Sequence, residues 1–487
     1  MPVGVFNKTR NDPTSDISIP AVQLLGELDA YTDKELDLQN HDYTSEATER
    51  RQQSNDLVNR SLRCAIQSYT AQWLPLVMQG DTLETNKAQS IIRQSWRVAR
   101  RDMLTVINRP CYRSVLALCL FDQTPTPVGI PEQEELDGIS RSVCLQTALL
   151  QVQQLRERLE SRQLNGVNVP TWTGRSENSA RGAVPTQTYL DLESRAYWAA
   201  VMWDTLSSLT SSYRTSLTSG LKGGCSEPAW RLAISFLSGS FCHTAENLRT
   251  TGTEVSDEVA CQITAAATTS ILYICKNIAS LKQAFREGVE EQSLLFTWKS
   301  LLDSIDFFQT SIRPLLNDCE KRLHFLDQAS RLSWYKVSSR YHLAILVLVD
   351  AIEAAGRSDL LPGLATAKQE AEHESFNVLK FGIGSTYMLY RSAEDSNTAS
   401  KFTYTTDMPQ QPIAASVVAI DPHPHDMVEL VRLMNKVISR KYLAGDIKHA
   451  TYSYLSSILI NALGQLPQGS KLVQAARENI QRSHHNE

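Results

Sequence analysis

The apolar residues of this chain recur at steps of three and four over most of its length. Such spacing places them along one stripe of an α-helix, whereas a strand with one buried face would alternate apolar and polar residues. We find no sustained alternation and no rhythm of strand, helix and strand. The sequence therefore predicts an all-α fold, a multi-helix array built from these segments: residues 45–78, 84–108, 114–121, 136–164, 191–214, 228–248, 257–290, 294–355, 360–390, 426–444, 447–463 and 470–482.

Three stretches interrupt the helical pattern. Residues 1–42 are polar and carry prolines, and we expect them to be loosely ordered. Residues 165–187 are rich in glycine, proline, serine and asparagine, and residues 392–424 carry several prolines, so we expect two long loops there. No repeat of fixed period is visible. Because one continuous core can hold this many helices, residues 43–487 are predicted to form a single all-helical domain.

The charge balance argues against a dedicated nucleic-acid-binding surface. The 487 residues carry a net charge of −5, whereas DNA binding usually requires a concentrated basic face. The densest basic cluster lies on one predicted helix, and we expect it to form a solvated face: Arg93, Arg97, Arg100 and Arg101.

Nothing in the sequence pattern indicates secretion or membrane insertion. The N-terminal residues lack the apolar core of a secretory signal. The longest apolar run, residues 343–349, is much shorter than the roughly 20 residues of a membrane span. The nine cysteines are scattered through helical segments, which predicts reduced thiols in an intracellular protein.

Motifs that would indicate catalysis are missing or incomplete. The chain has no glycine-rich phosphate loop and no nucleophile elbow. His423, His425 and Asp426 could grip a metal ion, but three residues on one loop do not by themselves make a site, and Asp426 is better explained as a cap of the following helix. Three other pairs are interpreted as ordinary helix residues: Asp303 with Asp306, Cys242 with His243, and His373 with Glu374. We therefore predict no catalytic, cofactor-binding or metal-binding residue, no cofactor and no enzyme activity.

One stretch, residues 191–214, reads DLESRAYWAAVMWDTLSSLTSSYR. A helix start is expected at Thr188, and Trp198 begins an apolar stripe. Arg195 and Asp204 are nine residues apart, which puts them on opposite sides of a helix and about 13 Å apart along its axis. Because they cannot pair with each other and an unpaired buried charge is costly, each is expected to bind a partner on another helix. The alternative is a buried helix whose two charges face solvent.

Six residues of this stretch follow a recognisable spacing: Glu193, Arg195, Trp198, Asp204, Ser208 and Arg214. They match the pattern E-x-R-x-x-W-x-x-x-x-x-D followed by a serine and an arginine, and the stretch thereby resembles the signature helix of the fungal-specific transcription factor domain. This domain is the middle homology region of zinc-cluster transcription factors. Residues 112–129 are similar to an earlier helix of that family. The resemblance implies an all-helical regulatory domain in which the six residues have an architectural role.

The chain departs from that family in its cysteines. Zinc-cluster factors carry closely spaced cysteines that hold two zinc ions, but this sequence has no C-x-x-C motif, and its first cysteine is Cys64. The resemblance therefore implies a transcriptional regulator that is nuclear or shuttles between nucleus and cytoplasm and has no zinc-cluster DNA contact of its own. The short apolar runs predict that it has no membrane attachment. Such a regulator is expected to act through a DNA-binding protein partner or as a homodimer, and to accept a small-molecule effector.

Two alternatives remain open at this point. The chain can be a truncated product of a full zinc-cluster factor. The same helical scaffold can also serve as an enzyme or ligand-binding protein of secondary metabolism, because a fold does not fix a function. A deep pocket with convergent polar groups and a titratable residue of perturbed pKa would favour this second alternative.

Overall fold

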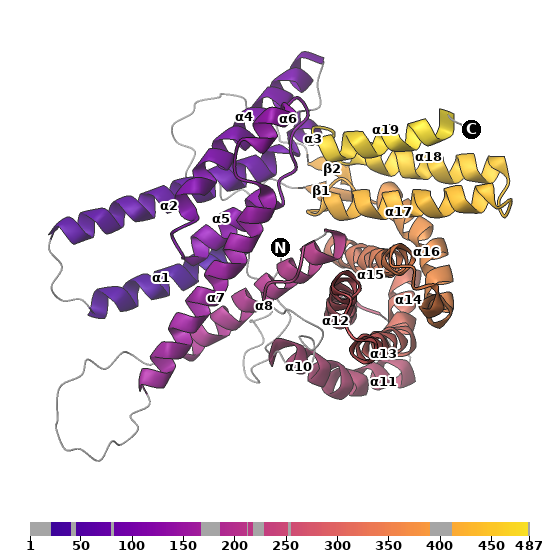
Figure 1. Ribbon diagram of the computed structural model, residues 1–487, viewed down its shortest axis with the longest axis horizontal. Helices are drawn as coiled ribbons and strands as arrows, with labels where there is room; N and C mark the ends of the chain where they lie inside the picture. Colours follow the sequence, from indigo (N-terminus) through magenta and orange to yellow (C-terminus); the bar gives the residue numbers. More distant parts are fainter. Residues whose placement is uncertain are drawn as a thin grey trace. The chain divides into compact units, whose positions relative to one another are not determined.

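A computed structural model describes the chain over residues 21–39, 45–78, 82–166, 186–211, 213–217, 228–251, 255–389 and 412–485. Over these residues the structure is mostly helical (Figure 1), which confirms the predicted all-α class. The sequence predicted a single domain for residues 43–487, whereas the observed contacts divide the chain into two compact units. Each unit is described by itself.

The first unit contains residues 1–72, 89–232 and 275–297. The helices mainly within it are α1 (Ala21–Gln39), α2 (Ser45–Ala71), α4 (Thr82–Val106), α5 (Tyr112–Asp122), α6 (Glu132–Leu136), α7 (Arg141–Gly166) and α8 (Gln187–Thr210). The helix α5 lies at the centre, because it contacts α1, α2 and α7. Nine of its 11 residues are buried, in agreement with the apolar run from which this helix was predicted.

The helix α1 contradicts the expectation of a loosely ordered N-terminal segment for residues 21–39. Leu24, Leu25 and Leu28 are buried, and the helix packs against α5 and α8. Even a helix of 19 residues is stabilised in a protein more by the tertiary contacts of its apolar face than by its own propensity. Residues 1–20 and 40–42 lie outside the described residues.

The helix α8 contains the family-like stretch and begins slightly earlier than predicted. Its N-terminal cap is Thr186, whose side chain accepts a hydrogen bond from the backbone N–H of Tyr189 at 3.3 Å. The predicted cap, Thr188, instead lies within the first helical turn. Residues 167–185, where a loop was expected, lie outside the described residues.

The second unit contains residues 73–88, 233–274 and 298–487, so α4, α10, α12 and α13 contribute residues to both units. Its elements are α3 (Leu74–Val77), α10 (Pro228–Ser235), η1 (Phe236–Phe241), α11 (Cys242–Thr251), α12 (Asp257–Glu287), α13 (Glu291–Phe307), η2 (Phe308–Ile312), α14 (Arg313–Lys321), α15 (Gln328–Ala354), η3 (Ser358–Leu364), α16 (Ala365–Gly384), α17 (Pro424–Leu443), α18 (His449–Gln465) and α19 (Lys471–His485).

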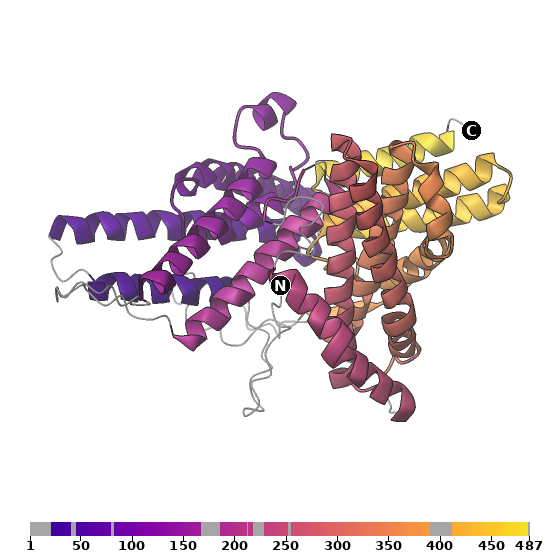
Figure 2. The same cartoon turned by 60° about the horizontal axis from the view of Figure 1, so that its bottom comes forward.

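The helix α15 forms the core of the second unit. Every residue from 341 to 349 is buried, because α16 and α17 both pack against this helix. The apolar run noted in the sequence is therefore a core helix segment. Figure 2 shows α17, α18 and α19 lying side by side, and each of the three contacts the other two.

A small antiparallel sheet corrects the prediction for residues 386–389 and 413–416. The strand β1 (Thr386–Leu389) was predicted as part of a helix, and β2 (Ile413–Ser416) as part of a long loop. The two strands pair with Thr386 opposite Ser416. The remainder of the expected loop from 392 to 411 lies outside the described residues.

One helix in the described part of the chain, α12, is long and apolar enough to cross a membrane. Its sequence contains no long uninterrupted apolar run, because polar residues are spread along it. In the structure, 61% of its most apolar window is buried inside the protein. Core helices of soluble proteins pass the same test, so the finding is weak evidence for a membrane span.

Candidate functional site

Asp204 lies near the C-terminal end of α8 and holds the loop that follows this helix. The residue is only 3% exposed. Its carboxylate accepts hydrogen bonds from the backbone N–H groups of Ser216 at 2.9 Å and Leu217 at 2.8 Å. These donors belong to the loop rather than to another helix. The carboxylate is thus buried and hydrogen-bonded as expected, although this binding differs from the predicted link between helices.

Two further signature residues make side-chain contacts within the first unit. Glu193 is buried, and its carboxylate lies 3.9 Å from the guanidinium of Arg156, which stacks over the ring of Tyr197 at 3.8 Å from the centroid. The ring of Trp198 lies edge-to-face against that of Trp230, with centroids 5.4 Å apart. Aromatic pairs of this geometry add to the energy of burial, so both residues fasten α8 within its unit.

The other three signature residues make weaker contacts with the rest of the first unit. Arg195 is half-buried and has no hydrogen bond or ion pair to any residue in the described ranges, so the partner expected on another helix is not found there. The hydroxyl of Ser208 donates to the carbonyl of Thr205 within the helix. Arg214 is exposed and pairs with Glu287 at 2.8 Å, and exposed pairs of this kind contribute little stability.

A lysine that the sequence did not single out closes the C-terminal end of α8. The ammonium of Lys282 donates to the carbonyl oxygen of Leu209 at 2.5 Å and to those of Ser208 and Ser211 at 3.2 Å. The last carbonyls of a helix lack partners within it and carry a partial negative charge, so a cation stabilises them. Lys282 lies more than 70 positions along the chain from the residues whose carbonyls it binds, and no local sequence pattern connects them.

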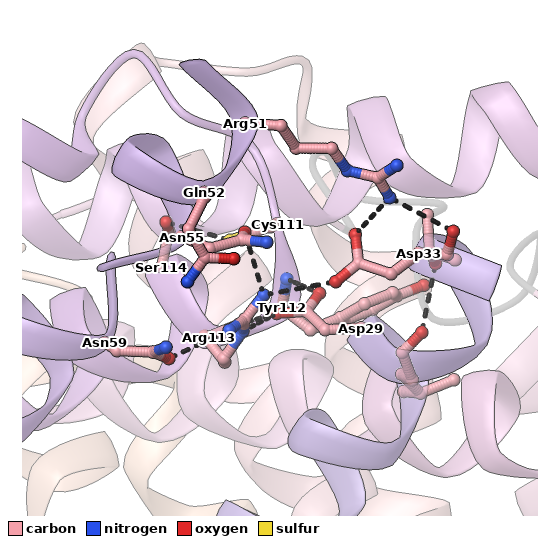
Figure 3. A network of polar contacts seen from close by, with 12 residues as sticks. Asp29, Asp33, Arg51, Gln52, Asn55, Asn59, Cys111, Tyr112, Arg113 and Ser114 are labelled. Atoms are coloured by element: carbon pink, nitrogen blue, oxygen red, sulfur yellow. Dashed lines mark hydrogen bonds and ion pairs between the residues drawn. The ribbon is translucent and has the colours of Figure 1, made fainter. Parts of the chain in front are cut away.

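Asp29 on α1 caps the helix α5 from outside (Figure 3). One carboxylate oxygen accepts the backbone N–H of Tyr112 at 2.8 Å. The other accepts the backbone N–H of Arg113 at 2.9 Å and the side-chain Nε of the same residue at 2.7 Å. The first N–H groups of a helix have no internal partners, and a carboxylate is well suited to bind them because the helix dipole is positive there.

Arg113 extends this network to α2. Its guanidinium donates to the side-chain oxygens of Asn59 at 2.8 Å and Asn55 at 3.3 Å, and lies 3.6 Å from Asp33. Arg51 then binds the Asp33 carboxylate at 2.9 Å, and Figure 3 shows these side chains converging between the helices. The network joins α1, α2 and α5, and all its members belong to the first unit. We interpret the network as structural, because its hydrogen bonds and ion pairs fasten these helices to one another. Burial and nearby Asp29 raise the pKa of the adjacent Cys111 thiol to about 11, so this thiol stays protonated near neutral pH.

The basic cluster on α4 is not the solvated face that we expected. Arg100 is 8% exposed and donates to the backbone carbonyls of Glu134, Glu135 and Ile139. Arg100 thereby fixes α6 and the loop that follows it. Arg97 forms a two-pronged ion pair with Glu134, at 2.5 and 2.8 Å. Arg93 is half-buried and Arg101 is exposed. The cluster therefore organises the first unit instead of presenting a uniform positive surface.

The structure brings His423, His425 and Asp426 together at the start of α17. One ligand atom from each residue lies within 4.8 Å of the others. His423 is 5% exposed, and the rings of the two histidines are 5.8 Å apart. The expected capping role of Asp426 is not observed, since no side-chain hydrogen bond caps α17 and Pro424 occupies its first turn. The loop itself is fixed by Asp421, whose carboxylate accepts the backbone N–H of His423 at 2.9 Å.

Charged groups and a small recess adjoin this cluster. The recess is lined by Lys336, Ser339, Arg340, Leu343, Asp421, Asp426, Met427 and Leu430, and its volume of ≈ 10 Å³ leaves room for about one water molecule. Burial raises the pKa of Asp426 to about 7, although Arg340 opposes the rise. Burial also lowers the pKa of His423 well below its ordinary value, and Arg340 lowers it further.

The three remaining pairs named in the sequence show no catalytic arrangement in the parts that are described. Asp303 and Asp306 are exposed on α13. His373 is exposed and lies 3.9 Å from the carboxylate of Glu374. The side chain of Cys242 lies outside the described residues.

A buried histidine in α15 was not identified from the sequence. His342 is 0% exposed, and neither ring nitrogen has a hydrogen-bond partner among the described residues. Burial lowers its pKa to about 3, and the nearby cation Arg313 contributes to the lowering. Its ring lies 5.5 Å from that of Tyr341. The imidazole is therefore held neutral in the core of the second unit.

Because the buried His342 resists protonation, the protein is expected to become less stable in acid. In the folded protein the pKa of His342 is about 3, below the ordinary value of about 6.5. Below pH 6.5 the unfolded chain therefore binds a proton at His342 that the folded protein does not bind. The free energy of unfolding is unaffected above pH 6.5 and decreases as the pH falls from 6.5 toward 3. At pH 5 the loss is about 2 kcal/mol. Urea unfolding at pH 7 and at pH 5 measures this loss. Between these two pH values the free energy of unfolding of His342→Leu should decrease by correspondingly less than that of the unmodified chain. The exposed-site control His373→Leu should behave like the unmodified chain, and an equal loss in His342→Leu would contradict the assignment.

Comparison with known proteins does not add to these observations. No family model matches the chain, and searches of curated proteins and of solved structures return no match.

Proposed function

We propose that this chain is a fungal transcriptional regulator of the zinc-cluster regulatory-domain type that lacks a zinc-cluster DNA reader. The proposal extends to a nuclear location, to action through a DNA-binding partner or a homodimer, and to the binding of a small-molecule effector. The observation that carries it is the signature helix α8. Asp204 and Glu193 are buried there, and Trp198 packs on Trp230, as residues with an architectural role should.

A tethering experiment tests the regulatory role directly. The full chain is fused to an unrelated DNA-binding domain and placed upstream of a reporter gene. Reporter expression is expected to change relative to the DNA-binding domain alone. Asp204→Leu should weaken this effect because it releases the loop that follows α8, while Arg214→Ala should preserve it because the Arg214 side chain is 67% exposed.

Gene deletion and localisation test the same proposal in the cell. A regulator is expected to enter the nucleus, and its deletion is expected to change a defined set of transcripts. If the protein stays outside the nucleus, no transcript set changes and the tethered chain leaves the reporter unaltered, the proposal fails.

The alternative of an enzyme or ligand carrier receives little support from the recess beside Asp426. Perturbed titratable groups are present there. Ligand pockets for small molecules usually have several hundred Å³, whereas this recess has room for about one water molecule.

A further inference from the structure

We propose that His423, His425 and Asp426 bind one divalent transition-metal ion, such as Zn²⁺, at the start of α17. Two imidazoles and a carboxylate are ligand types that zinc accepts, whereas magnesium and calcium prefer oxygen ligands. The site belongs entirely to the second unit and does not depend on the proposed regulatory role.

The separations within the cluster are close to those of a zinc site. Bonds of about 2.0–2.2 Å in a tetrahedron place ligand atoms about 3.4 Å apart. The Nε2 atom of His425 is already 3.5 Å from a carboxylate oxygen of Asp426, and all three ligand atoms lie within 4.8 Å of one another. Binding therefore requires a movement of about an ångström.

The first turn of α17 can supply this movement without refolding. His423 is 5% exposed and its backbone is held by Asp421, so its ring forms the fixed part of the site. The side chains of His425 and Asp426 are 21% and 14% exposed, and small side-chain rotations can bring them closer. Pro424 between the two histidines restricts the backbone, because its ring fixes φ.

Asp426 also lines the small recess, although neither histidine does, so a fourth ligand can approach the ion from the Asp426 side of the cluster. Catalytic zinc sites use three protein ligands and leave the fourth position to water or another small ligand, and the recess has room for about one water molecule. Lys336 and Arg340 also line the recess and repel a bare dication, while Asp421 and Asp426 attract it. This balance favours an anionic fourth ligand, such as hydroxide.

Cobalt binding to the full chain tests the proposal. After removal of metals with a chelator, titration with Co²⁺ should produce visible ligand-field absorption that saturates at one ion per chain, and Zn²⁺ should displace the cobalt. His425→Gln and Asp426→Asn should each weaken binding about tenfold or more, since even outer-shell changes have effects of that size. The control His373→Gln removes an exposed histidine beside a carboxylate and should leave binding unchanged.

A second measurement keeps the test independent of variant folding. X-ray absorption at the zinc edge of the unmodified chain should show imidazole ligands together with oxygen. The absence of cobalt absorption from the unmodified chain would overturn the proposal, as would full binding by both His425→Gln and Asp426→Asn. Loss of binding on replacing the C-terminal pair His484 and His485 with glutamine would overturn it as well, because the metal would then bind the terminus.

Discussion

Replacing Asp204 with leucine is expected to lower the free energy of unfolding of the first unit by about 3–5 kcal/mol. The carboxylate binds the backbone N–H groups of Ser216 and Leu217, and hydrogen bonds to a charged acceptor contribute about 1.5–3 kcal/mol each. Leucine leaves both donors without this acceptor, and the N–H of Leu217 is buried. Urea denaturation followed by circular dichroism measures the loss.

Two variants separate the role of this carboxylate from a general effect on the region. Asp204→Asn keeps the shape and one acceptor oxygen, so its loss should be intermediate. Arg214→Ala removes the ion pair with Glu287 at an exposed position and should change stability by less than about 1 kcal/mol. A change within about 0.5 kcal/mol for Asp204→Leu is typical of an exposed surface residue and would show that the loop does not depend on the carboxylate.

Replacing Asp29 with alanine should lower the free energy of unfolding of the first unit by a similar amount, about 3–5 kcal/mol. The substitution removes the partner of the 17%-exposed Arg113 side chain and the acceptor of the first N–H groups of α5. Removing one member of a buried ion pair is strongly destabilising, and the Asp33 carboxylate, 3.6 Å from the Arg113 guanidinium, offsets only part of the charge that remains. Thermal unfolding and amide hydrogen exchange in α5 should both show the effect.

A double-mutant cycle assigns this loss to the pair. If the two side chains act together, the combined Asp29→Ala and Arg113→Ala chain should lose clearly less stability than the sum of the single changes. Asp33→Ala serves as the control, since its side chain is 38% exposed, and it should lose about 1 kcal/mol or less. Additive losses from Asp29 and Arg113 would contradict the proposed coupling.

Several elements of the candidate sites could be predicted because their signals are local. The apolar run of α5 predicted a buried helix. The sequence also drew attention to His423, His425 and Asp426, although these residues were not predicted to bind a metal. Asp204 was expected to be buried and bound, and its observed donors lie only 12 and 13 residues further along the chain.

The periodicity of apolar residues by itself determined that the described chain is helical, because each helix bond joins residues four positions apart and each apolar stripe lies within one segment. Tertiary structure alone decided that α1 is ordered, that Arg100 is buried and that Lys282 closes α8. The sequence does not show whether the side chain of an arginine or lysine will be surrounded by water or will bind backbone carbonyls that are distant along the chain. Only the folding of remote segments against it decides whether its charge is solvated or replaced by hydrogen bonds, as with the 39 residues that separate Arg100 from the carbonyl of Ile139.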